Sequence, residues 1–395
     1  MKKFIGLLLI LGLTICFHMN TYSTENNPKE NETNSDAGGI IVDCRSALLM
    51  EPTSGKILYE KNPNERFAPA SVTKIMTMLL AMERIDSGQI LLTDTITVSE
   101  NAKAMGGSTM LLDTGEVRTV EEILKGIAIC SGNDAAVAMA EYIGGSEQNF
   151  VNMMNERAKE LGMSNTTFMN SSGLPASGHL STANDISLMS RELLKHPQIL
   201  KYTGIYMETL SEGRKTPVEM VNHNKLVRFF SGCDGLKTGF TDEAKYCISA
   251  TAQRDGVRIL SIIVGAPTWQ IRNRDASMLM NYGFSQFTNK QIITKDEELQ
   301  QVPLNKNGDK FFILRAQDNF SCIVHKNDTV EIRKVCKFEL KSKKYEINEV
   351  IGTCEIYLGD QLVGEINVYT DREFKVGGFV DNIKDNLQRL MDFGI

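Results

Sequence analysis

Three short segments carry residues whose types and spacing could do chemistry together. In the first, Ser71 and Lys74 are three residues apart, so on a helix the hydroxyl and the amine lie on one face. The amine could take the hydroxyl proton if burial and a second cation lowered its pKa from about 10.4 toward neutrality. At the start of a buried helix, Ser71 would also offer its backbone N–H to a developing oxyanion. This pair predicts an activated serine nucleophile.

The second segment is Ser131-Gly-Asn133, sixty residues further along. Its hydroxyl could relay a proton between the nucleophile, the amine and a leaving group, and the Asn133 amide could bind a peptide carbonyl. Ser99-Glu-Asn101 has the same pattern but precedes a polar stretch. Ser131 instead closes an apolar helix, which would hold its loop rigidly against the core. We therefore favour Ser131.

The third segment is Lys237-Thr238-Gly239. Lys237 could lower the pKa of Lys74 and attract a substrate carboxylate, and Thr238 could donate a hydrogen bond to that carboxylate. Gly239 removes a side chain where a ligand must lie close to a strand. The three segments together predict a hydrolytic site for a substrate that carries a carboxylate.

The elements that must position these segments follow from hydrophobic periodicity. The stretch 68–82 is apolar on nearly every side, which predicts a helix buried all round. Thr119 and Glu122 form a capping box before a second helical pattern, and a third follows Asn133, so Ser131 is expected in a loop between two helices. Turn chemistry also predicts two antiparallel hairpins. Their strands are residues 46–50 with 56–59, and 246–252 with 257–264.

The length of 395 residues exceeds what one hydrophobic core usually supports, so we expect two folded domains. Lys2 and Lys3 precede an apolar run that is short for a membrane span and typical of a secretory signal, with an uncleaved anchor as the alternative. The last residues place apolar side chains on one helical face. The predicted parts are a signal peptide (1–23), a flexible linker (24–39), a catalytic domain (40–290), a small β-sandwich domain (291–376) and an amphipathic C-terminal helix (377–395).

Composition excludes several functional classes. The net charge of −6 gives no basic footprint for nucleic acid. Without Cys16 in the leader, seven cysteines remain, an odd number without CxxC spacing, so no disulfide framework is expected. The five histidines form no metal-ligand pattern. We expect neither a metal nor another cofactor.

The sequence resembles the low-molecular-mass penicillin-binding D-alanyl-D-alanine carboxypeptidases, serine peptidases that trim peptidoglycan stem peptides. The resemblance covers most of the chain, with the motifs in family order. The matching segments are Ala68–Thr77, Ser131–Ala135, Asn170–Pro175, Ser181–Asp185, Asn222–Leu226 and Asp234–Thr241.

The resemblance implies a role for each matching residue. Ser71 would be the acylated nucleophile and Lys74 its base, with Ser131 and Asn133 as the second motif. The N–H groups of Ser71 and Phe240 would form the oxyanion hole. The carboxylate-binding residues would be Lys237 and Thr238, with Gly239 on the same strand and Arg272 as a further arginine.

The resemblance also implies the fold class: an α/β chain of the α+β type, with a serine β-lactamase-like catalytic domain, an antiparallel sheet with helices on both sides, and a small all-β domain after it. The implied partners are stem peptides ending in D-Ala-D-Ala, β-lactams as inhibitors, and a membrane touched peripherally by 377–395. Packing on the protein or dimerisation is the alternative for that helix. The implied location is the outer face of the cytoplasmic membrane or the cell wall.

Two other functions use related features. A serine β-lactamase has the same three motifs, but class A enzymes add a glutamate in an ExxLN loop, and none lies between Asn133 and Lys237. A non-catalytic wall-binding or sporulation scaffold would be expected to lose Ser71 or Lys74, and both are present. The carboxypeptidase is therefore the main prediction.

Overall fold

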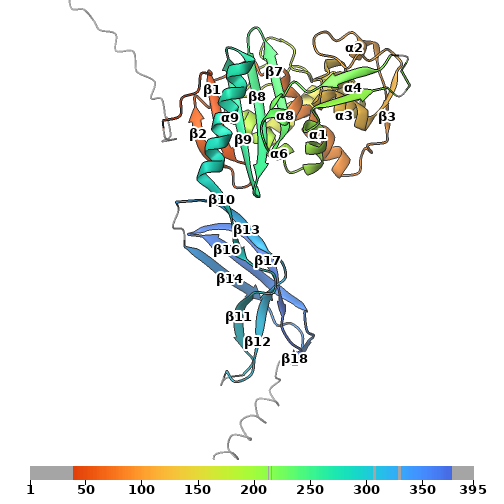
Figure 1. The fold of residues 1–395 in the computed structure, drawn as a ribbon. Coiled ribbons are helices and arrows are strands. Elements are labelled where there is room, and N and C mark those ends of the chain that lie inside the picture. Colours follow the sequence, from red (N-terminus) through yellow and green to blue (C-terminus); the bar gives the residue numbers. More distant parts are fainter. Residues whose placement is uncertain (1–38, 212, 215, 306–307, 328–330, 376–395) are drawn as a thin grey trace, which may run out of the picture. The chain divides into compact units, whose positions relative to one another are not determined.

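The computed structural model describes residues 39–375 except 212, 215, 306–307 and 328–330 (Figure 1). The predicted signal peptide, nearly all of the predicted linker and the predicted C-terminal helix lie outside the described residues. Among the residues that are described, no helix is long and apolar enough to cross a bilayer.

A five-stranded antiparallel sheet organises the first part of the chain. Its strands pair in the order β2-β1-β9-β8-β7. Both expected hairpins are present, because β1 pairs with β2 and β8 with β9. The strands of this sheet are β1 (Ser46–Glu51), β2 (Lys56–Lys61), β7 (Cys233–Thr241), β8 (Lys245–Arg254) and β9 (Val257–Ala266). Two small pairs lie apart from it, β3 (Thr95–Thr97) with β4 (Val117–Thr119) and β5 (Met207–Leu210) with β6 (Val218–Val221).

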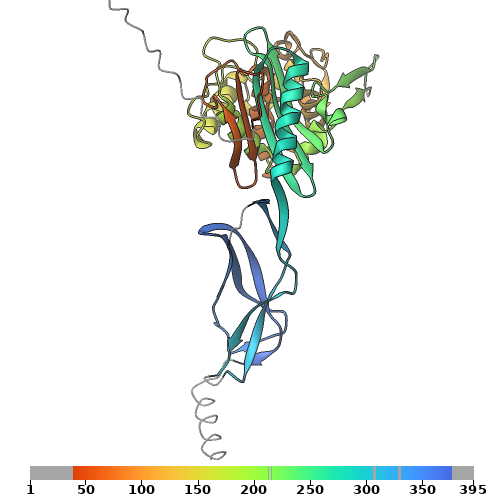
Figure 2. The same cartoon turned by 60° about the vertical axis from the view of Figure 1, so that its left-hand side comes forward.

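Helices cover both faces of this sheet. Side chains alternate along a strand, so Leu49 of β1 packs with Leu279 of helix α9, whereas Leu48 packs in the other core with α1 and α6. Figure 2 shows α9 lying along one face. The helices are α1 (Lys74–Asp86), α2 (Glu100–Lys103), α3 (Val120–Ala128), α4 (Asn133–Gly144), α5 (Glu147–Glu160), α6 (Ala183–Leu193), α7 (Leu200–Thr203), α8 (Leu226–Phe229) and α9 (Trp269–Gln286), with 3₁₀ turns η1 (Ala70–Thr73) and η2 (Pro197–Ile199).

Helix α1 is the central helix that the sequence predicts. Residues 74–82 are all buried, so this part of the helix has no solvent face. Its α-helical part begins at Lys74, later than the predicted 68, because Ala70 has a left-handed φ of 48° and the next residues form the 3₁₀ turn η1. Ser71 therefore sits in a tight turn directly before the helix. The predicted capping box of Thr119 and Glu122 is present at the start of α3.

The last part of the chain is all-β, as predicted. A five-stranded antiparallel sheet has the order β11-β12-β17-β16-β14, and β10 pairs with β13 and β15 with β18. Phe312 lies in the core of this part and stacks on Phe374 at 4.2 Å between ring centroids. The strands are β10 (Phe287–Ile293), β11 (Glu298–Pro303), β12 (Phe311–Ala316), β13 (Phe320–His325), β14 (Ile332–Phe338), β15 (Lys344–Tyr345), β16 (Val350–Leu358), β17 (Gln361–Thr370) and β18 (Phe374–Lys375).

The fold class is therefore confirmed: helices with antiparallel sheets, then a small all-β part. The exact domain boundaries at 40–290 and 291–376 stay predictions. The seven cysteines of the described residues are all free thiols.

Candidate active site

Lys74 is fully buried at the start of α1 and points its amine at three oxygen atoms. Its Nζ lies 3.1 Å from Ser71 Oγ. It donates to Asn133 Oδ1 and to the carbonyl oxygen of Ser172, both at 2.6 Å. The i, i+3 spacing of hydroxyl and amine thus produces the predicted contact across the η1–α1 junction.

The surroundings of this amine favour its neutral form. The pKa of Lys74 is lowered well below 10.5, first by burial and then by the positive charge of Lys237. A neutral amine has two N–H groups and one lone pair. Because Asn133 and Ser172 offer only acceptors, they take the two N–H groups. The lone pair is then left for the Ser71 O–H, which is the arrangement that a general base requires.

The second segment lies beside this pair. Ser131 is 1% exposed and has a left-handed φ of 61° in the loop between α3 and α4. Asn133 begins α4, and its backbone N–H donates to the carbonyl oxygen of Ser108 at 2.7 Å. The alternative Ser99 has a structural contact instead, because it caps α2 and donates to Glu141 at 2.6 Å. The geometry therefore brings Ser131, and not Ser99, to the site.

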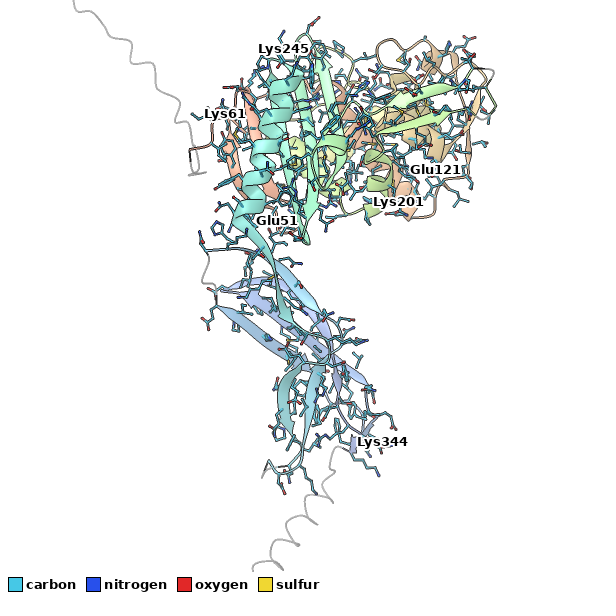
Figure 3. All side chains as sticks on the ribbon, viewed as in Figure 1. Glu51, Lys61, Glu121, Lys201, Lys245 and Lys344 are labelled. Atoms are coloured by element: carbon cyan, nitrogen blue, oxygen red, sulfur yellow. The ribbon has the colours of Figure 1, made fainter. Side chains whose placement is uncertain are left out.

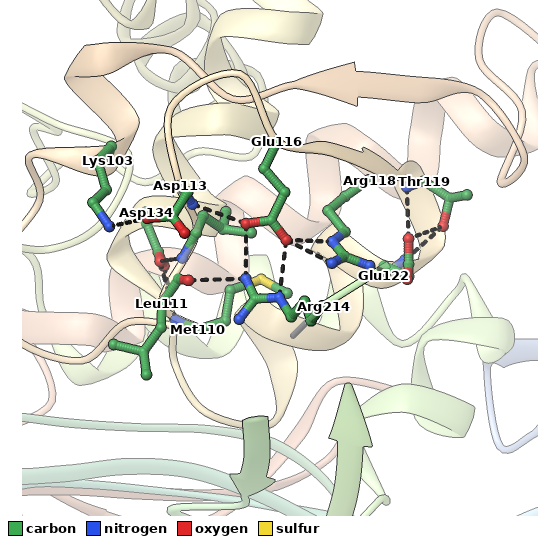
Figure 4. A network of polar contacts seen from close by, with 11 residues as sticks. Lys103, Met110, Leu111, Asp113, Glu116, Arg118, Thr119, Glu122, Asp134 and Arg214 are labelled. Carbon is green, nitrogen blue, oxygen red and sulfur yellow. Dashed lines mark hydrogen bonds and ion pairs between the residues drawn. The ribbon is translucent and has the colours of Figure 1, made fainter. Parts of the chain in front are cut away.

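A polar network holds the loop that faces this segment (Figure 4). The buried carboxylate of Asp134 accepts the backbone N–H groups of Met110 and Leu112, at 3.0 to 3.1 Å. Further along the loop, Glu116 accepts from Arg214 at 2.9 Å, and Arg214 also donates to the carbonyl oxygen of Leu111 at 2.8 Å. These bonds fix the loop against the start of α4, so the position of Asn133 does not depend on its own contacts alone.

The third segment lies on β7, at the edge of the sheet next to η1. Lys237 is buried and donates to the carbonyl oxygen of Thr238 at 2.9 Å. Its pKa falls to about 7, mainly through burial, with a further contribution from Arg272. A Cβ at Gly239 would lie 3.1 Å from the backbone nitrogen of Ser71. The glycine therefore lets the strand lie against the turn that carries the nucleophile. The sequence alone suggests a different reason for the glycine, namely close approach of a ligand.

One cavity of about 440 Å³ joins the three segments. Of the nine predicted site residues, six line it directly, and Lys74, Asn133 and Lys237 are buried behind its wall. The lining residues are Ser71, Ser108, Ser131, His223, Lys225, Thr238, Gly239, Phe240, Tyr246, Trp269 and Arg272.

Comparisons with known proteins agree with this geometry. The sequence profile of the D-alanyl-D-alanine carboxypeptidase family matches residues 30–268. The chain belongs to this family. A second profile, the C-terminal domain of penicillin-binding protein 5, matches residues 287–376.

Relatives of this carboxypeptidase family member are similar along nearly the whole chain. The D-alanyl-D-alanine carboxypeptidase DacF of Bacillus subtilis is 39% identical over 386 residues, 97% of each chain. Among solved structures, penicillin-binding protein 5 of Haemophilus influenzae is 27% identical with a TM-score of 0.64, covering 86% of this chain and 99% of that one. The PBP3 structure of Streptococcus pneumoniae, described as a peptidoglycan synthesis regulatory factor, is 25% identical with a TM-score of 0.70, covering 85% and 100%.

The two remaining predicted residues of this family member also reach the cavity. Arg272 projects from α9, is 5% exposed and donates to Asn273 Oδ1 through Nε and a terminal nitrogen at 3.0 and 2.8 Å. Burial lowers its pKa to about 10, so it stays a cation at neutral pH. Phe240 is 48% exposed and its ring lies 4.4 Å from that of Tyr246.

Sequence reasoning missed several residues of the cavity wall. Ser108 and Tyr246 carry no chemical signal of their own. His223 and Lys225 belong to the Asn222–Leu226 motif, which is identified in the sequence. The motif alone does not determine which of its side chains face the cavity. Trp269, the first residue of α9, also lines the cavity. His179 is buried outside the cavity lining, and its Nε2 lies 3.0 Å from Thr73 Oγ1.

Proposed function

We propose that Ser71 is the nucleophile of a serine D-Ala-D-Ala carboxypeptidase that removes the terminal D-Ala from peptidoglycan stem peptides. The observation that carries this proposal is the 3.1 Å contact between Ser71 Oγ and a buried Lys74 amine whose other hydrogens are already used. The activity itself agrees with the family to which the chain belongs. Neither the β-lactamase nor the scaffold alternative is favoured by these relatives.

The acylation step follows from the same atoms. Lys74 accepts the Ser71 hydroxyl proton while Oγ attacks the carbonyl carbon of the penultimate D-Ala. The backbone N–H groups of Ser71 and Phe240 stabilise the oxyanion of the tetrahedral intermediate. The C–N bond then breaks, and the amine of the terminal D-Ala takes up the proton through Ser131. The product of this step is an ester between Ser71 and the shortened peptide.

Hydrolysis completes the cycle. With the leaving amino acid gone, Lys74 is neutral again and can accept a proton from water that attacks the ester carbonyl. The same two N–H groups stabilise the second oxyanion. Ser71 regains its proton and the peptide leaves with a new carboxylate. A β-lactam would acylate the same oxygen, since its amide carbonyl presents the same target.

Binding of the substrate carboxylate is assigned to three residues. Lys237, once protonated, and Arg272 supply positive charge, and Thr238 supplies a hydroxyl in the cavity wall. Asn133 would bind a peptide carbonyl through the second hydrogen of its Nδ2, since the first is donated to the carbonyl oxygen of Gly106 at 2.7 Å. No residue of this mechanism calls for a metal or cofactor.

The location also belongs to the proposal. A stem peptide is part of the wall, so the chain would act after export, on the outer face of the cytoplasmic membrane or in the cell wall. Peripheral membrane contact through 377–395 is a separate hypothesis. Liposome flotation of the mature chain with and without residues 377–395 tests it, and equal binding by both would refute it.

The deciding experiment follows D-Ala release from a defined pentapeptide ending in D-Ala-D-Ala, alongside benzylpenicillin turnover. The proposal predicts steady release of D-Ala and a long-lived penicillin adduct. Ser71→Ala should abolish both while leaving the thermal unfolding transition in place. Rapid penicillin turnover without D-Ala release would instead indicate a β-lactamase, and D-Ala release by folded Ser71→Ala would refute the assignment of the nucleophile.

A further inference from the structure

Beside the cavity lies a group of two cations and two aromatic rings that the mechanism above does not use. It consists of Tyr206, Lys225, Arg228 and Phe229, and we call it the basic–aromatic shelf. The Lys225 amine lies 5.1 Å and the Arg228 guanidinium 4.9 Å from the centroid of the Tyr206 ring. Arg228 is also 5.6 Å from the Phe229 ring, which meets Tyr206 edge-on at 6.4 Å. Contacts of this kind orient cations without neutralising them.

The backbone under the shelf is fixed to the elements that carry the site. Asn222 donates through Nδ2 to the carbonyl oxygens of Thr203 and Ile205, at 3.0 and 2.8 Å. Asn224 donates to the carbonyl oxygen of Gly235 on β7 at 3.0 Å. These bonds hold the turn that carries Lys225 against the strand that carries Lys237. The backbone under the shelf is therefore fixed in place by hydrogen bonds to neighbouring elements.

The charges of the shelf are unopposed. Within the described part of the chain, no carboxylate forms an ion pair with Lys225, Arg228 or Arg272. The positive charges of Lys225 and Arg228 both lie against the Tyr206 ring. Lys225 also lines the cavity together with Arg272, which is assigned to the substrate carboxylate. Desolvation lowers the pKa of His223, and the positive charges of Lys237 and Lys225 lower it further. An anion at the shelf would relieve this repulsion.

The position of Lys225 in the cavity wall indicates which anion the shelf could bind. Lys225 lines the same cavity as Ser71, so a molecule bound for reaction at Ser71 can reach this member of the shelf, and Arg228 lies across the Tyr206 ring from it. The C-terminal carboxylate of the substrate is already assigned to Lys237, Thr238 and Arg272. We propose that the shelf binds a second carboxylate of the stem peptide, carried on a side chain upstream of the scissile bond, and so favours peptides that have one. This inference rests on the proposed carboxypeptidase function.

Two pentapeptides test the inference. They differ only at the third residue, which is lysine in one and diaminopimelate, with its additional side-chain carboxylate, in the other. The variants are Lys225→Gln and Arg228→Gln. The matched control is Lys201→Gln, which changes an exposed lysine of the same part of the chain, on α7 (Figure 3).

The expected result is a selective loss. An ion pair in a partly exposed setting is worth about a three- to fivefold change in kcat/KM per cation, so each variant should lower kcat/KM for the diaminopimelate peptide by that factor. The lysine peptide should change by less than about twofold, Lys201→Gln should change neither, and Lys225→Arg should keep the preference. Raising the salt concentration should shrink the preference of the unaltered chain.

Two results would overturn the inference. Equal losses for both peptides would mean that the shelf acts on folding or on the common part of the substrate, and no loss for either would mean that it binds nothing. Failure of the proposed function looks different, because the unaltered chain would then release D-Ala from neither peptide. Thermal unfolding of each variant separates loss of folding from loss of selectivity.

Discussion

Strand β7 lies close to the turn that carries the nucleophile, and Gly239→Ala would perturb this contact. A Cβ at Gly239 would lie 3.1 Å from Ala70 Cβ and from the backbone nitrogens of Ser71 and Val72. Ordinary contact for such an atom begins at 3.4 Å, so strand and turn must separate by a few tenths of an ångström. A misplacement of 1 Å at a reacting centre can cost on the order of 10²-fold. Scaled to about 0.3–0.5 Å, the expected loss in kcat/KM is about four- to tenfold.

The reason for this loss is the proposed oxyanion site, to which the N–H groups of Ser71 and Phe240 would contribute from the two sides of the contact. The assay is the rate of acylation by a fluorescent penicillin together with D-Ala release, with urea unfolding to confirm a folded variant. Ala70→Gly supplies a matched second change, because residue 70 has a φ of 48° that glycine adopts readily. In the Gly239→Ala background it should restore part of the rate, since the contacts with the two nitrogens remain. Unchanged acylation by folded Gly239→Ala would refute the reasoning.

Three further predictions concern the charged groups of the site. Lys74→Met removes the base and should lower acylation and D-Ala release by about 10²- to 10⁴-fold in a chain that still unfolds cooperatively; activity within tenfold of the unaltered chain would contradict the role of the amine. The pKa of Lys237 is about 7, so its charge is present below and lost above that pH, and kcat/KM should fall as the pH rises through this range. Lys237→Arg, which stays charged, should move this alkaline limit upward, and an unmoved pH profile would assign it to another group. Asp134→Asn replaces a carboxylate that accepts three backbone N–H groups and should lower the free energy of unfolding by about 1–3 kcal/mol in urea titrations, whereas an unchanged midpoint would show that the loop is held elsewhere.

Much of the fold could be predicted from the sequence because its signals are local. A capping box, a hairpin turn and a helix that is apolar all round depend on residues within a few positions of one another, as Thr119 and Glu122 show. The spacing of Ser71 and Lys74 is local in the same way. The remaining site residues were predicted from the resemblance to a known family, which rests on the three motifs and their order.

The parts that could not be predicted depend on contacts between distant positions. The carbonyl oxygen of Ser172, 98 residues away in the sequence, accepts a hydrogen bond from the Lys74 amine. Because the acceptor is a backbone atom, no residue type indicates this contact in the sequence. Asp134 follows the second motif directly, but two of its three backbone N–H partners lie more than twenty positions earlier. The start of α1 was placed too early because the left-handed φ of Ala70, a residue that usually favours helix, has no sequence signature.

The position of the acyl group shows directly whether Ser71 is the nucleophile. The chain is incubated with benzylpenicillin, quenched, digested and mapped by mass spectrometry. One adduct per chain is expected, on Ser71, and its rate of formation should fall steeply in Lys74→Met. An adduct on Ser131 or on any other side chain, or one that forms at an undiminished rate without the Lys74 amine, would contradict the claim that a neutral lysine activates this serine.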